Sequence, residues 1–461
     1  MIDQTEVQSS ILRPSTADQV ELIFLTLCCP PRMRAFVWAA ADQVTTSAVA
    51  EQRLAEGEHH ALNVGLTAKG LRLAGIDVRA YDALPSTFTR GMGDAAERLL
   101  DVGDAAPEGW QPPFRGGEPR VHAVILRFGG APLELLEPFV GAPSSCRHGK
   151  ATATGEDDGR VATGQVVTWR GFHDPEGREP FGFVDGITDP VIEGSPKPLS
   201  PGNGVWDAEA GEWRPVRAGE AVLGHGDESG AVSGHPDAAH LEIDGSYLVV
   251  RKLEQDVEAF HDACEAWAGT LPGTTAEEVE AQLVGRHHDG RVVGAEHLGA
   301  RANDFLYRDE RRPVAAMPPS AHVHRANPRD GVAAASAIVP RHVLFRRSYR
   351  YRDVEGDTAK EGLLFLACCA DLRRQFEFVQ AQWLQDGNRF GLGLERDPIA
   401  GRRSDPGAPC EAARDEDQVS IAHEGARVRR CMSSFVTTRG GEYFLLPSRS
   451  ALRLLGDPGV G

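Results

Sequence analysis

The clearest sign of chemistry in this sequence is one carboxylate, Asp185, which lies between glycines in the apolar run FGFVDGITDP (181–190). On local signals alone, Val-Asp-Gly-Ile predicts a hairpin turn, because Asp tolerates and Gly favours a left-handed backbone. The functional alternative is that Gly182 and Gly186, which lack side chains, let the backbone approach something large and flat while Asp185 points at it. Only the rest of the chain separates these interpretations.

A second group of reactive side chains lies further along the chain, in SAHVHRANPRDG, where His322 and His324 are followed by Arg325. Histidine is a common metal ligand, but a single histidine is more often a packed or solvated residue. Two at this spacing do not make a zinc site without further ligands. About twenty residues later, the apolar strand end VLFRRSYRYR presents Arg346 and Arg347, for which a solvated charge run is the simple alternative.

Composition narrows the class of protein. The chain has 461 residues, 41% of them hydrophobic, which predicts a soluble globular protein of two or more domains. Its formal charge of -18 argues against nucleic acid or an anionic membrane surface as a partner. The sequence shows neither an export signal nor an apolar run of membrane-spanning length, so we expect a cytoplasmic protein. None of the eight cysteines has the two-residue spacing of zinc ribbons or covalent haem attachment.

Hydrophobic periodicity predicts two α+β halves. The first has strands at ELIFLTLCC (21–29) and VHAVILRF (121–128) with helices between them, and a loop-rich middle follows, with a hairpin bearing Trp206 and Trp213. The second begins with a strand at 246–250 and a helix whose apolar positions run from Leu253 to Cys264. It continues with a helix over EGLLFLACCADLRRQFEFVQAQWLQDG and a last strand, EYFLLP. The predicted division is 1–190, a connector at 191–240, and 241–461.

An Asp in a glycine frame, a His and an Arg at strand ends are together the parts of a haem peroxidase site. The chain resembles the dye-decolourising (DyP-type) haem peroxidases, whose Gly-x-x-Asp-Gly motif is matched by GFVDG (182–186). Further matching blocks occur in order along the chain: VLGHGDESG, DGSYLVVRKLEQDV, AHVHRANPRD, VLFRRSYRY, RRQFEFVQAQWLQDG, GLGLERDPIAG and FVTTRGGEYFLLPS. The resemblance implies tandem ferredoxin-like domains with antiparallel sheets, and one haem b held mainly by the C-terminal half.

By this resemblance His322, six residues before Pro328, falls on the position of the axial ligand of the haem iron, and His324 is the rival. An acid is expected to hydrogen-bond the ligand imidazole, with Asp397 as the first candidate and Glu395 as the second. A partner of this kind raises electron density at the iron.

On the peroxide side of the haem, the resemblance implies that Asp185 moves a proton between the peroxide oxygens and that Arg346 stabilises the departing hydroxide. The simpler role for Arg346 is a haem propionate or surface ion pair, and Arg347 could exchange roles with it. We expect Gly182, Gly186, Arg325 and Arg347 to contact the cofactor.

The implied function is an oxidation of bulky aromatic donors, phenols and dyes, by hydrogen peroxide through a ferryl porphyrin radical. Tyr349, Tyr351 and Trp383 are candidates for a surface electron relay, with packing as the alternative role of each. Two other functions stay open: iron release from haem, whose known proteins typically carry an export signal, and haem storage or transport. A carrier has no use for the Asp185–Arg346 pair, which therefore favours catalysis. The sequence leaves the oligomeric state open.

Overall fold

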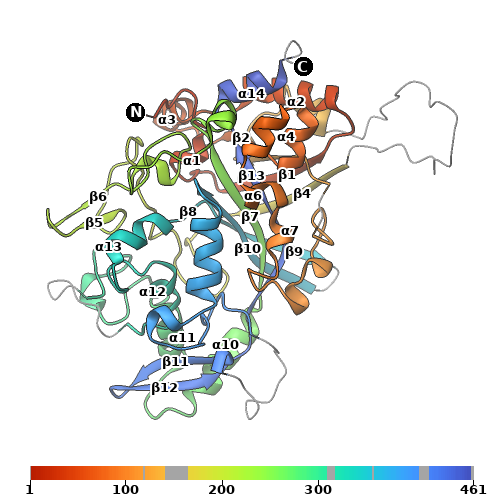
Figure 1. Cartoon of the computed structure of the whole chain (residues 1–461). Coiled ribbons are helices and arrows are strands. Elements are labelled where there is room, and N and C mark those ends of the chain that lie inside the picture. Colours follow the sequence, from red (N-terminus) through yellow and green to blue (C-terminus); the bar gives the residue numbers. More distant parts are fainter. Residues whose placement is uncertain are drawn as a thin grey trace.

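One antiparallel sheet forms the centre of the molecule (Figure 1). The computed structural model describes residues 2–117, 120–140, 165–308, 317–355, 358–403 and 415–457. Eight strands close into a barrel, because β10 pairs with β7 as well as with β9. In spatial order they are β7 (Ser246–Gln255), β13 (Val436–Leu446), β2 (Ala61–Leu66), β3 (Ala123–Phe128), β1 (Gln19–Thr26), β4 (Gln165–Phe172), β9 (Tyr349–Glu355) and β10 (Thr358–Cys369). The short β8 (Phe345–Arg346) continues the row on β10 beyond the end of β9.

The strand order is the same in both halves of the chain. Counted in chain order, the N-terminal four lie as β4-β1-β3-β2 and the C-terminal four as β13-β7-β10-β9, which is fourth-first-third-second in each case. The expected α+β class with antiparallel pairing is therefore confirmed. The antiparallel strands of the two halves form one barrel, since the edges of the halves join each other, and the ferredoxin-like character of each half stays a prediction. The predicted domain boundaries at 190 and 240 stay a prediction.

The two joins between the halves are narrow. Strand β4 meets β9 at Phe172 and Arg350, and β2 meets β13 at Leu66 and Leu445. Side chains reinforce both joins. Gln8, fully buried, donates from Nε2 to the carbonyl oxygens of Val64 and Pro447 and accepts from the Val64 N–H. At the other join, Arg350 forms ion pairs with Asp174 and Glu361.

Helices cover the sheet from outside. In the upper part of Figure 1, α2 and α14 pack together beside the chain ends, with α4 next to α2. The helices are α1 (Ser9–Leu12), α2 (Pro30–Gln43), α3 (Ser47–Ala55), α4 (Ala68–Ala74), α5 (Val78–Ala83), α6 (Ser86–Arg90), α7 (Met92–Ala95), α8 (Glu137–Val140), α9 (Ala239–Glu242), α10 (Val257–Ala268), α11 (Ala276–Val284), α12 (His322–Ala326), α13 (Ala335–Ile338) and α14 (Arg449–Gly456). The described part of the chain contains no helix that is both long and apolar enough to cross a membrane.

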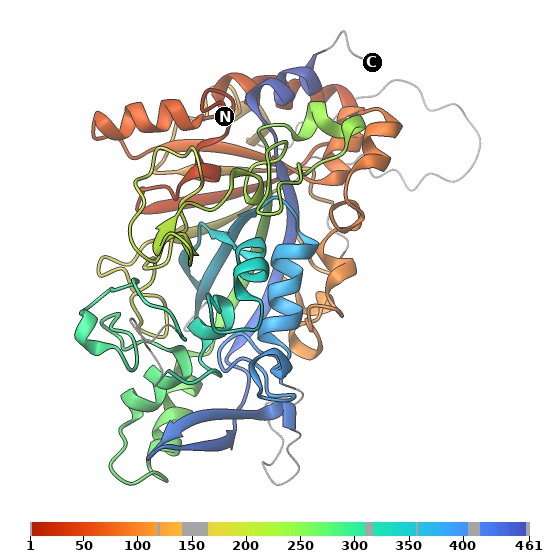
Figure 2. The same cartoon turned by 60° about the vertical axis from the view of Figure 1, so that its left-hand side comes forward.

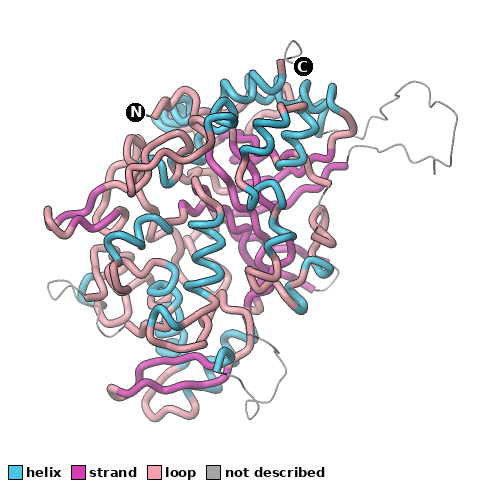
Figure 3. Tube along the Cα trace, in the orientation of Figure 1, coloured by secondary structure: helices cyan, strands magenta, loops and turns pink. Residues whose placement is uncertain are grey.

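The C-terminal half carries more irregular structure than the N-terminal half (Figure 3). Two consecutive π-helical segments, η7 (Arg373–Glu377) and η8 (Val379–Leu384), form the blue helix in front of the sheet in Figure 1. A separate hairpin of β11 (Gln418–His423) and β12 (Ala426–Cys431) lies at the end of the molecule away from both termini, as the turned view also shows (Figure 2). The hairpin of β5 (Val205–Asp207) and β6 (Glu212–Arg214) pairs Trp206 with Trp213, as predicted.

Three sequence predictions for the C-terminal half need correction. The apolar run EGLLFLACC belongs to strand β10, and the helix begins only after it, at η7. Periodicity cannot separate a fully buried strand from a buried helix, which explains this error. Leu253 lies in β7, and α10 starts at Val257 with the Asp256 carboxylate accepting from the Ala259 N–H. The last predicted strand, EYFLLP, is the end of β13, which starts six residues earlier than predicted.

Candidate active site

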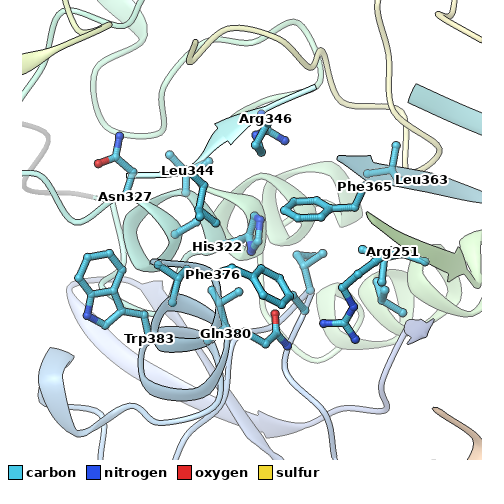
Figure 4. Close-up of a pocket in the computed structure, with 18 of the residues that line it drawn as sticks. Arg251, His322, Asn327, Leu344, Arg346, Leu363, Phe365, Phe376, Gln380 and Trp383 are labelled. Carbon is cyan, nitrogen blue, oxygen red and sulfur yellow. The ribbon is translucent and has the colours of Figure 1, made fainter. Parts of the chain in front are cut away.

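A cavity of about 330 Å³ lies between one face of β7, β10 and β13 and the segments η7, η8 and α12. Alternate residues of each strand face it, as the two-residue period of a strand requires. Asp185, His322 and Arg346, the three residues expected to do chemistry, all line this cavity. Figure 4 shows the His322 ring projecting into it, with Arg346 at one side and the rings of Phe365 and Phe376 at another.

Asp185 and Arg346 form an ion pair, with 2.9 Å between Asp185 Oδ1 and Arg346 Nη2. They are 161 residues apart in sequence and come from different halves. Arg346 is held by strand β8, which pairs with Ala367 and Cys368 of β10. The Asp185 N–H donates to the Gly177 carbonyl, which fixes its backbone. The structure thus brings together the two residues expected on the peroxide side.

The GFVDG segment is the return arm of a small hairpin. Arg178 pairs with Val184, and the turn is formed by Glu179 to Gly182, so it comes just before Asp185 and not at Val-Asp-Gly-Ile. Gly182 and Gly186 have φ angles of +95° and +71°, which side chains rarely allow. A Cβ at Gly186 would meet nothing within 4 Å, and one at Gly182 only His288 at 3.8 Å. The glycines therefore set the backbone conformation, and the expectation that they let the backbone approach a flat group stays a prediction.

The Glu179 side chain braces this hairpin from inside. Its two carboxylate oxygens accept from the N–H groups of Phe181 and Phe183, each at 3.0 Å, and one of them also accepts from Gln255 Nε2. The Arg178 guanidinium donates to the Gly182 carbonyl at 2.7 Å on the other side. Glu179 itself lines the cavity. We did not predict this residue from the sequence, although its position three residues before the glycine-framed motif was visible.

The charges of the pair determine the ionisation of Asp185. Burial by itself would raise the pKa of Asp185, but the Arg346 charge and a hydrogen bond from the Gly186 N–H outweigh it and hold the pKa below the ordinary 3.8. In turn, the Asp185 carboxylate raises the pKa of Arg346. Asp185 is therefore a carboxylate at neutral pH.

His322 begins helix α12, and its Nδ1 lies 3.0 and 3.1 Å from the two oxygens of Asp397. Asp397 is fully buried and also accepts from the N–H groups of Ile399 and Ala400. Burial would raise the pKa of Asp397, but the His322 ring and the Arg325 charge together lower it. An Asp397 carboxylate that accepts from Nδ1–H leaves Nε2 of His322 as the nitrogen with a free lone pair.

His324 and Glu395, the alternatives to His322 and Asp397, lie elsewhere. The His324 ring stacks on Tyr307 at 3.7 Å with an interplanar angle of 2°, is 7% exposed and does not line the cavity. Burial lowers its pKa to about 4, so it is a neutral packing residue at pH 7. Glu395 accepts from the Ser420 N–H and hydroxyl and from Arg427, and therefore does not reach His322.

Arg325 and Arg347 do not fit the cofactor contacts expected of them, because neither lines the cavity. The buried Arg325 guanidinium donates to the backbone carbonyls of Trp383, Leu384 and Glu395. That of Arg347 donates to the carbonyls of two residues near the N-terminus, Ser10 and Ile11. Both arginines connect backbone segments. Of the two neighbouring arginines, Arg346 is therefore the one for the role beside Asp185.

The relay candidates differ in position. Trp383 lines the cavity and is 1% exposed. Tyr349 is buried against His173, with ring centroids 4.0 Å apart, and donates to the Ala17 carbonyl. The Tyr351 ring lies 4.5 Å from the Lys252 ammonium. All three are at most 2% exposed, which suits packing and gives none of them a surface position.

The residues around the cavity fit a haem. Among the described residues no three His, Cys, Asp or Glu side chains are placed to hold a bare metal ion. The cavity instead offers one imidazole nitrogen, fixed from behind by Asp397, within walls formed largely by apolar side chains such as Leu363, Phe365 and Phe376. A macrocycle supplies the other iron ligands itself and needs one axial ligand from the protein, which this donor set provides.

Comparisons with known proteins find dye peroxidases. The family model described as "Dyp-type peroxidase, C-terminal" matches residues 227–392. The chain is 29% identical to multifunctional dye peroxidase DyP2 of an Amycolatopsis species, over 98% of this chain and 95% of that protein. It is 25% identical to dye-decolorizing peroxidase msp1 of Mycetinis scorodonius, over 98% and 87%.

Solved structures with the same fold cover nearly the whole chain. An ancestral D-type dye decolorizing peroxidase matches with a TM-score of 0.75 and 25% identity over 98% of both chains. A fungal DyP-type peroxidase from Auricularia auricula-judae matches with a TM-score of 0.74 over 99% of this chain and 100% of that one, and at 22% identity it informs on the fold alone.

Proposed function

Because the chain belongs to the dye-decolourising (DyP-type) peroxidase family of oxidoreductases, we propose that it binds haem b and uses hydrogen peroxide to oxidise bulky aromatic donors such as phenols and dyes. The observation that carries this proposal is the Asp185–Arg346 pair, which lines the same cavity as His322. When bound, the haem would supply the cleavage of peroxide and the storage of its oxidising equivalents. The repeated strand order supports a further part of the proposal, that the two halves are ferredoxin-like units joined edge to edge.

His322 would hold the haem through Nε2, and Asp397 would orient the ring through Nδ1. A carboxylate at this place keeps the proton on Nδ1 and makes the imidazole a stronger electron donor. The hydrogen bonds from Ile399 and Ala400 keep Asp397 in position. Replacing this acid would change the electron donation without removing the ligand.

Asp185 Oδ2 would accept a proton from one peroxide oxygen and return it to the other, which leaves as water. Arg346 holds the Oδ1 side of the carboxylate and would offset the negative charge that develops on the departing oxygen. The low pKa of Asp185 keeps it ready to accept the proton at neutral and mildly acidic pH. A carboxylate with a depressed pKa on the peroxide side of the haem therefore favours activity at acidic pH.

The alternatives of iron release and of haem storage need haem binding only. Neither has a role for a carboxylate and a guanidinium paired in the cavity, so the pair favours the peroxidase. A store or carrier would gain more from a second axial ligand, and among the described residues that line the cavity His342 is the one other histidine. The His342 ring stacks on Phe378 at 3.9 Å, and its Nδ1 is bonded to the Arg374 carbonyl, so a neutral backbone group takes the place that Asp397 has behind His322.

The test is to load the protein with haem, record its absorption spectrum, and add peroxide with and without a dye. We expect a spectrum of histidine-ligated haem, a rapid change with peroxide, and dye oxidation. Arg346→Leu should keep the haem and slow the reaction with peroxide at least tenfold. Haem loss from this variant, with an unchanged rate per bound haem, would assign Arg346 to a haem propionate. Haem binding without any peroxide-dependent dye oxidation would support the carrier.

A further inference from the structure

Four buried polar atoms of residues that line the cavity have no hydrogen-bond partner among the residues that the structure describes. They are Asp101 Oδ2, Arg251 Nε, Gln255 Oε1 and Arg402 Nε. Their residues are 5%, 3%, 7% and 8% exposed, and all four line the cavity. An unpaired polar atom at such burial is destabilising, so several in one cavity point to a missing partner.

Asp101, Arg251, Arg402 and Thr438 form one cluster, which we call the lateral chamber, whereas Gln255 lies four residues further along the same face of β7 and bonds Glu179. Arg251 Nη2 donates to Asp101 Oδ1 and to the Thr438 hydroxyl, and this hydroxyl donates to Asp101 Oδ1 at 2.7 Å. Although burial raises the pKa of Asp101, the charges of both Arg251 and Arg402 act on it in the opposite direction. The arginines are therefore held close to the same carboxylate.

The lateral chamber is set apart from the Asp185–Arg346 pair by the sheet itself. Arg346 lies on β8, which borders β10, whereas Arg251 lies on β7, on the other side of β10. The apolar side chains Leu363 and Phe365 of β10 come between them, paired with Leu253 and Arg251. Figure 4 shows the Arg251 side chain on the opposite side of Phe365 and Phe376 from His322. The chamber is thus a separate part of the cavity.

The unpaired atoms define the chemistry of a partner. In the chamber Arg251 Nε and Arg402 Nε are donors and Asp101 Oδ2 is an acceptor, so the partner must both accept and donate. A hydroxyl group does both with a single oxygen. The adjacent walls are aromatic and aliphatic, with Arg251 itself 5.6 Å from the Phe376 ring centroid. Such walls suit the body of one aromatic ring.

We propose that the lateral chamber binds the hydroxyl of a single-ring phenol, with the ring against Phe365 and Phe376, and that this is an internal donor site beside the haem pocket. The proposal rests on the proposed function and adds a place and a size limit for one class of donor. In the overall reaction two phenols and one hydrogen peroxide give two phenoxyl radicals and two waters. Each phenol loses one electron and one proton, and the peroxide takes up the two electrons and the two protons.

Other occupants fit less well. Water would satisfy the four polar atoms but leave the apolar wall uncovered. A benzoate-type carboxylate would place negative charge next to Asp101 Oδ2, which repels it. An aryl ether such as anisole accepts but cannot donate. These differences supply the probes for a test.

The test measures binding of phenol, anisole and benzoate to the haem-loaded protein by calorimetry, without peroxide, and separately the KM for phenol and for a large dye. We expect phenol to bind at least tenfold more tightly than anisole or benzoate. Asp101→Asn should weaken phenol binding and raise its KM about tenfold, with the KM for the dye unchanged. Thr438→Val keeps the volume of the side chain and should weaken phenol binding about threefold. It serves as the test variant if Asp101→Asn does not fold.

Matched controls exist on the same strands. Asp353 pairs with Lys252, the neighbour of Arg251 on the opposite face of β7, and does not line the cavity. Thr437 is the neighbour of Thr438 on β13 and also lies outside the cavity lining. Asp353→Asn and Thr437→Val should bind phenol like the parent protein.

The outcomes separate this inference from the proposed function. Equal phenol binding in the parent, Asp101→Asn and Thr438→Val, with dye oxidation intact, overturns the chamber and leaves the peroxidase. Phenol binding that depends on Asp101, without oxidation of any donor, keeps the chamber as a phenol site and removes the peroxidase. Absence of saturable phenol binding assigns the chamber to ordered water. Haem loss from Asp101→Asn with unchanged phenol binding assigns it to a haem side chain.

Discussion

At the residue scale, the structure separates the two neighbouring histidines. His322 faces the cavity with Asp397 behind it, whereas His324 is stacked on Tyr307. We expect His322→Ala to lose the spectrum of axial histidine ligation, with haem binding weakened at least tenfold. His324→Ala should keep that spectrum and instead lower the free energy of unfolding by about 1–2 kcal/mol, because it removes a buried ring. The reverse pattern in absorption spectra and denaturation curves would exchange the assignments.

The ionisation of Asp185 should govern the acid side of the pH profile. Its carboxylate form is the one that accepts a proton, and its pKa is held below 3.8 by Arg346 despite burial. The reaction with peroxide should therefore keep its rate to a lower pH than an aspartate with the ordinary pKa of 3.8 would allow, and should decline as the carboxylate protonates. The rate is measured by rapid mixing at each pH.

Asp185→Asn keeps the volume and removes this group. We expect its rate to be about 10²–10⁴-fold lower and without the acid decline, since no carboxylate is left to titrate. Because the pKa of Asp185 is depressed in the folded protein, its pairing with Arg346 also stabilises the fold at pH above the ordinary pKa of 3.8. This stabilisation is lost as pH falls through the depressed pKa. An Asn variant that reacts at the parental rate would leave Arg346 or a water as the dominant group.

At the scale of single elements, the hairpin that carries Asp185 depends on Glu179, which accepts from Phe181 N–H, Phe183 N–H and Gln255. Glutamine at this position has one acceptor oxygen and places an NH₂ group against a backbone N–H. We expect Glu179→Gln to shift the hairpin and to slow the reaction with peroxide about 10- to 100-fold, with haem content unchanged.

Glu176→Gln is the matched control for this change. Its side chain is 74% exposed and pairs only with Arg178, so the rate should stay within twofold of the parent. An equal loss of rate in both variants would mean that the negative charge of this segment matters, and not the hydrogen bonds that Glu179 accepts from the hairpin.

The elements also show what the sequence could and could not reveal. The parts of the site that follow short motifs were predictable: Asp185 in its glycine frame, His322 before Pro328, and Arg346 at a strand end. Asp397 ranked first for the contact with His322, and its geometry agrees, although its role is still a proposal. Arg325 and Arg347 were misplaced because a guanidinium that binds backbone carbonyls looks, in sequence, like one that faces a ligand.

Residues contributed by long-range pairing were not predictable in this way. Glu179, Asp101 and Thr438 meet the cavity only because β7, β13 and the N-terminal half are assembled around it. The strand character of EGLLFLACC was missed for a related reason. Its dense apolar composition suits a buried helix as well as a buried strand. Pairing with β7 and β9 makes it a strand, and a single sequence does not display this pairing.

At the scale of the whole molecule, both halves contribute to the active site, so the joins between them should matter for stability. Gln8 makes three hydrogen bonds across the join of β2 and β13. We expect Gln8→Leu to lower the free energy of unfolding by about 2–4 kcal/mol, because it leaves buried backbone groups unpaired. Urea denaturation measures this change.

Gln52→Leu serves as its control. Gln52 is exposed on α3 and bonds only Glu56, so its replacement should change the free energy of unfolding by less than about 0.5 kcal/mol. A small effect of Gln8→Leu, comparable with the control, would show that the closure of the barrel rests on its strand pairs and apolar core instead.

Closure of the barrel also affects how copies of this protein can meet. A strand with unpaired N–H and C=O groups is a template for pairing with another chain, the route to aggregation and strand exchange. All eight barrel strands have a neighbour on both sides, but each join between the halves holds a single residue pair, so the strand edges are least covered there. On the small hairpin of β11 and β12, strand β12 carries Arg427, Arg429 and Arg430, whose like charges repel a second copy of that edge. Strand pairing between two copies of the main sheet would therefore have to start at one of the joins, which the side chains of Gln8 and Arg350 reinforce.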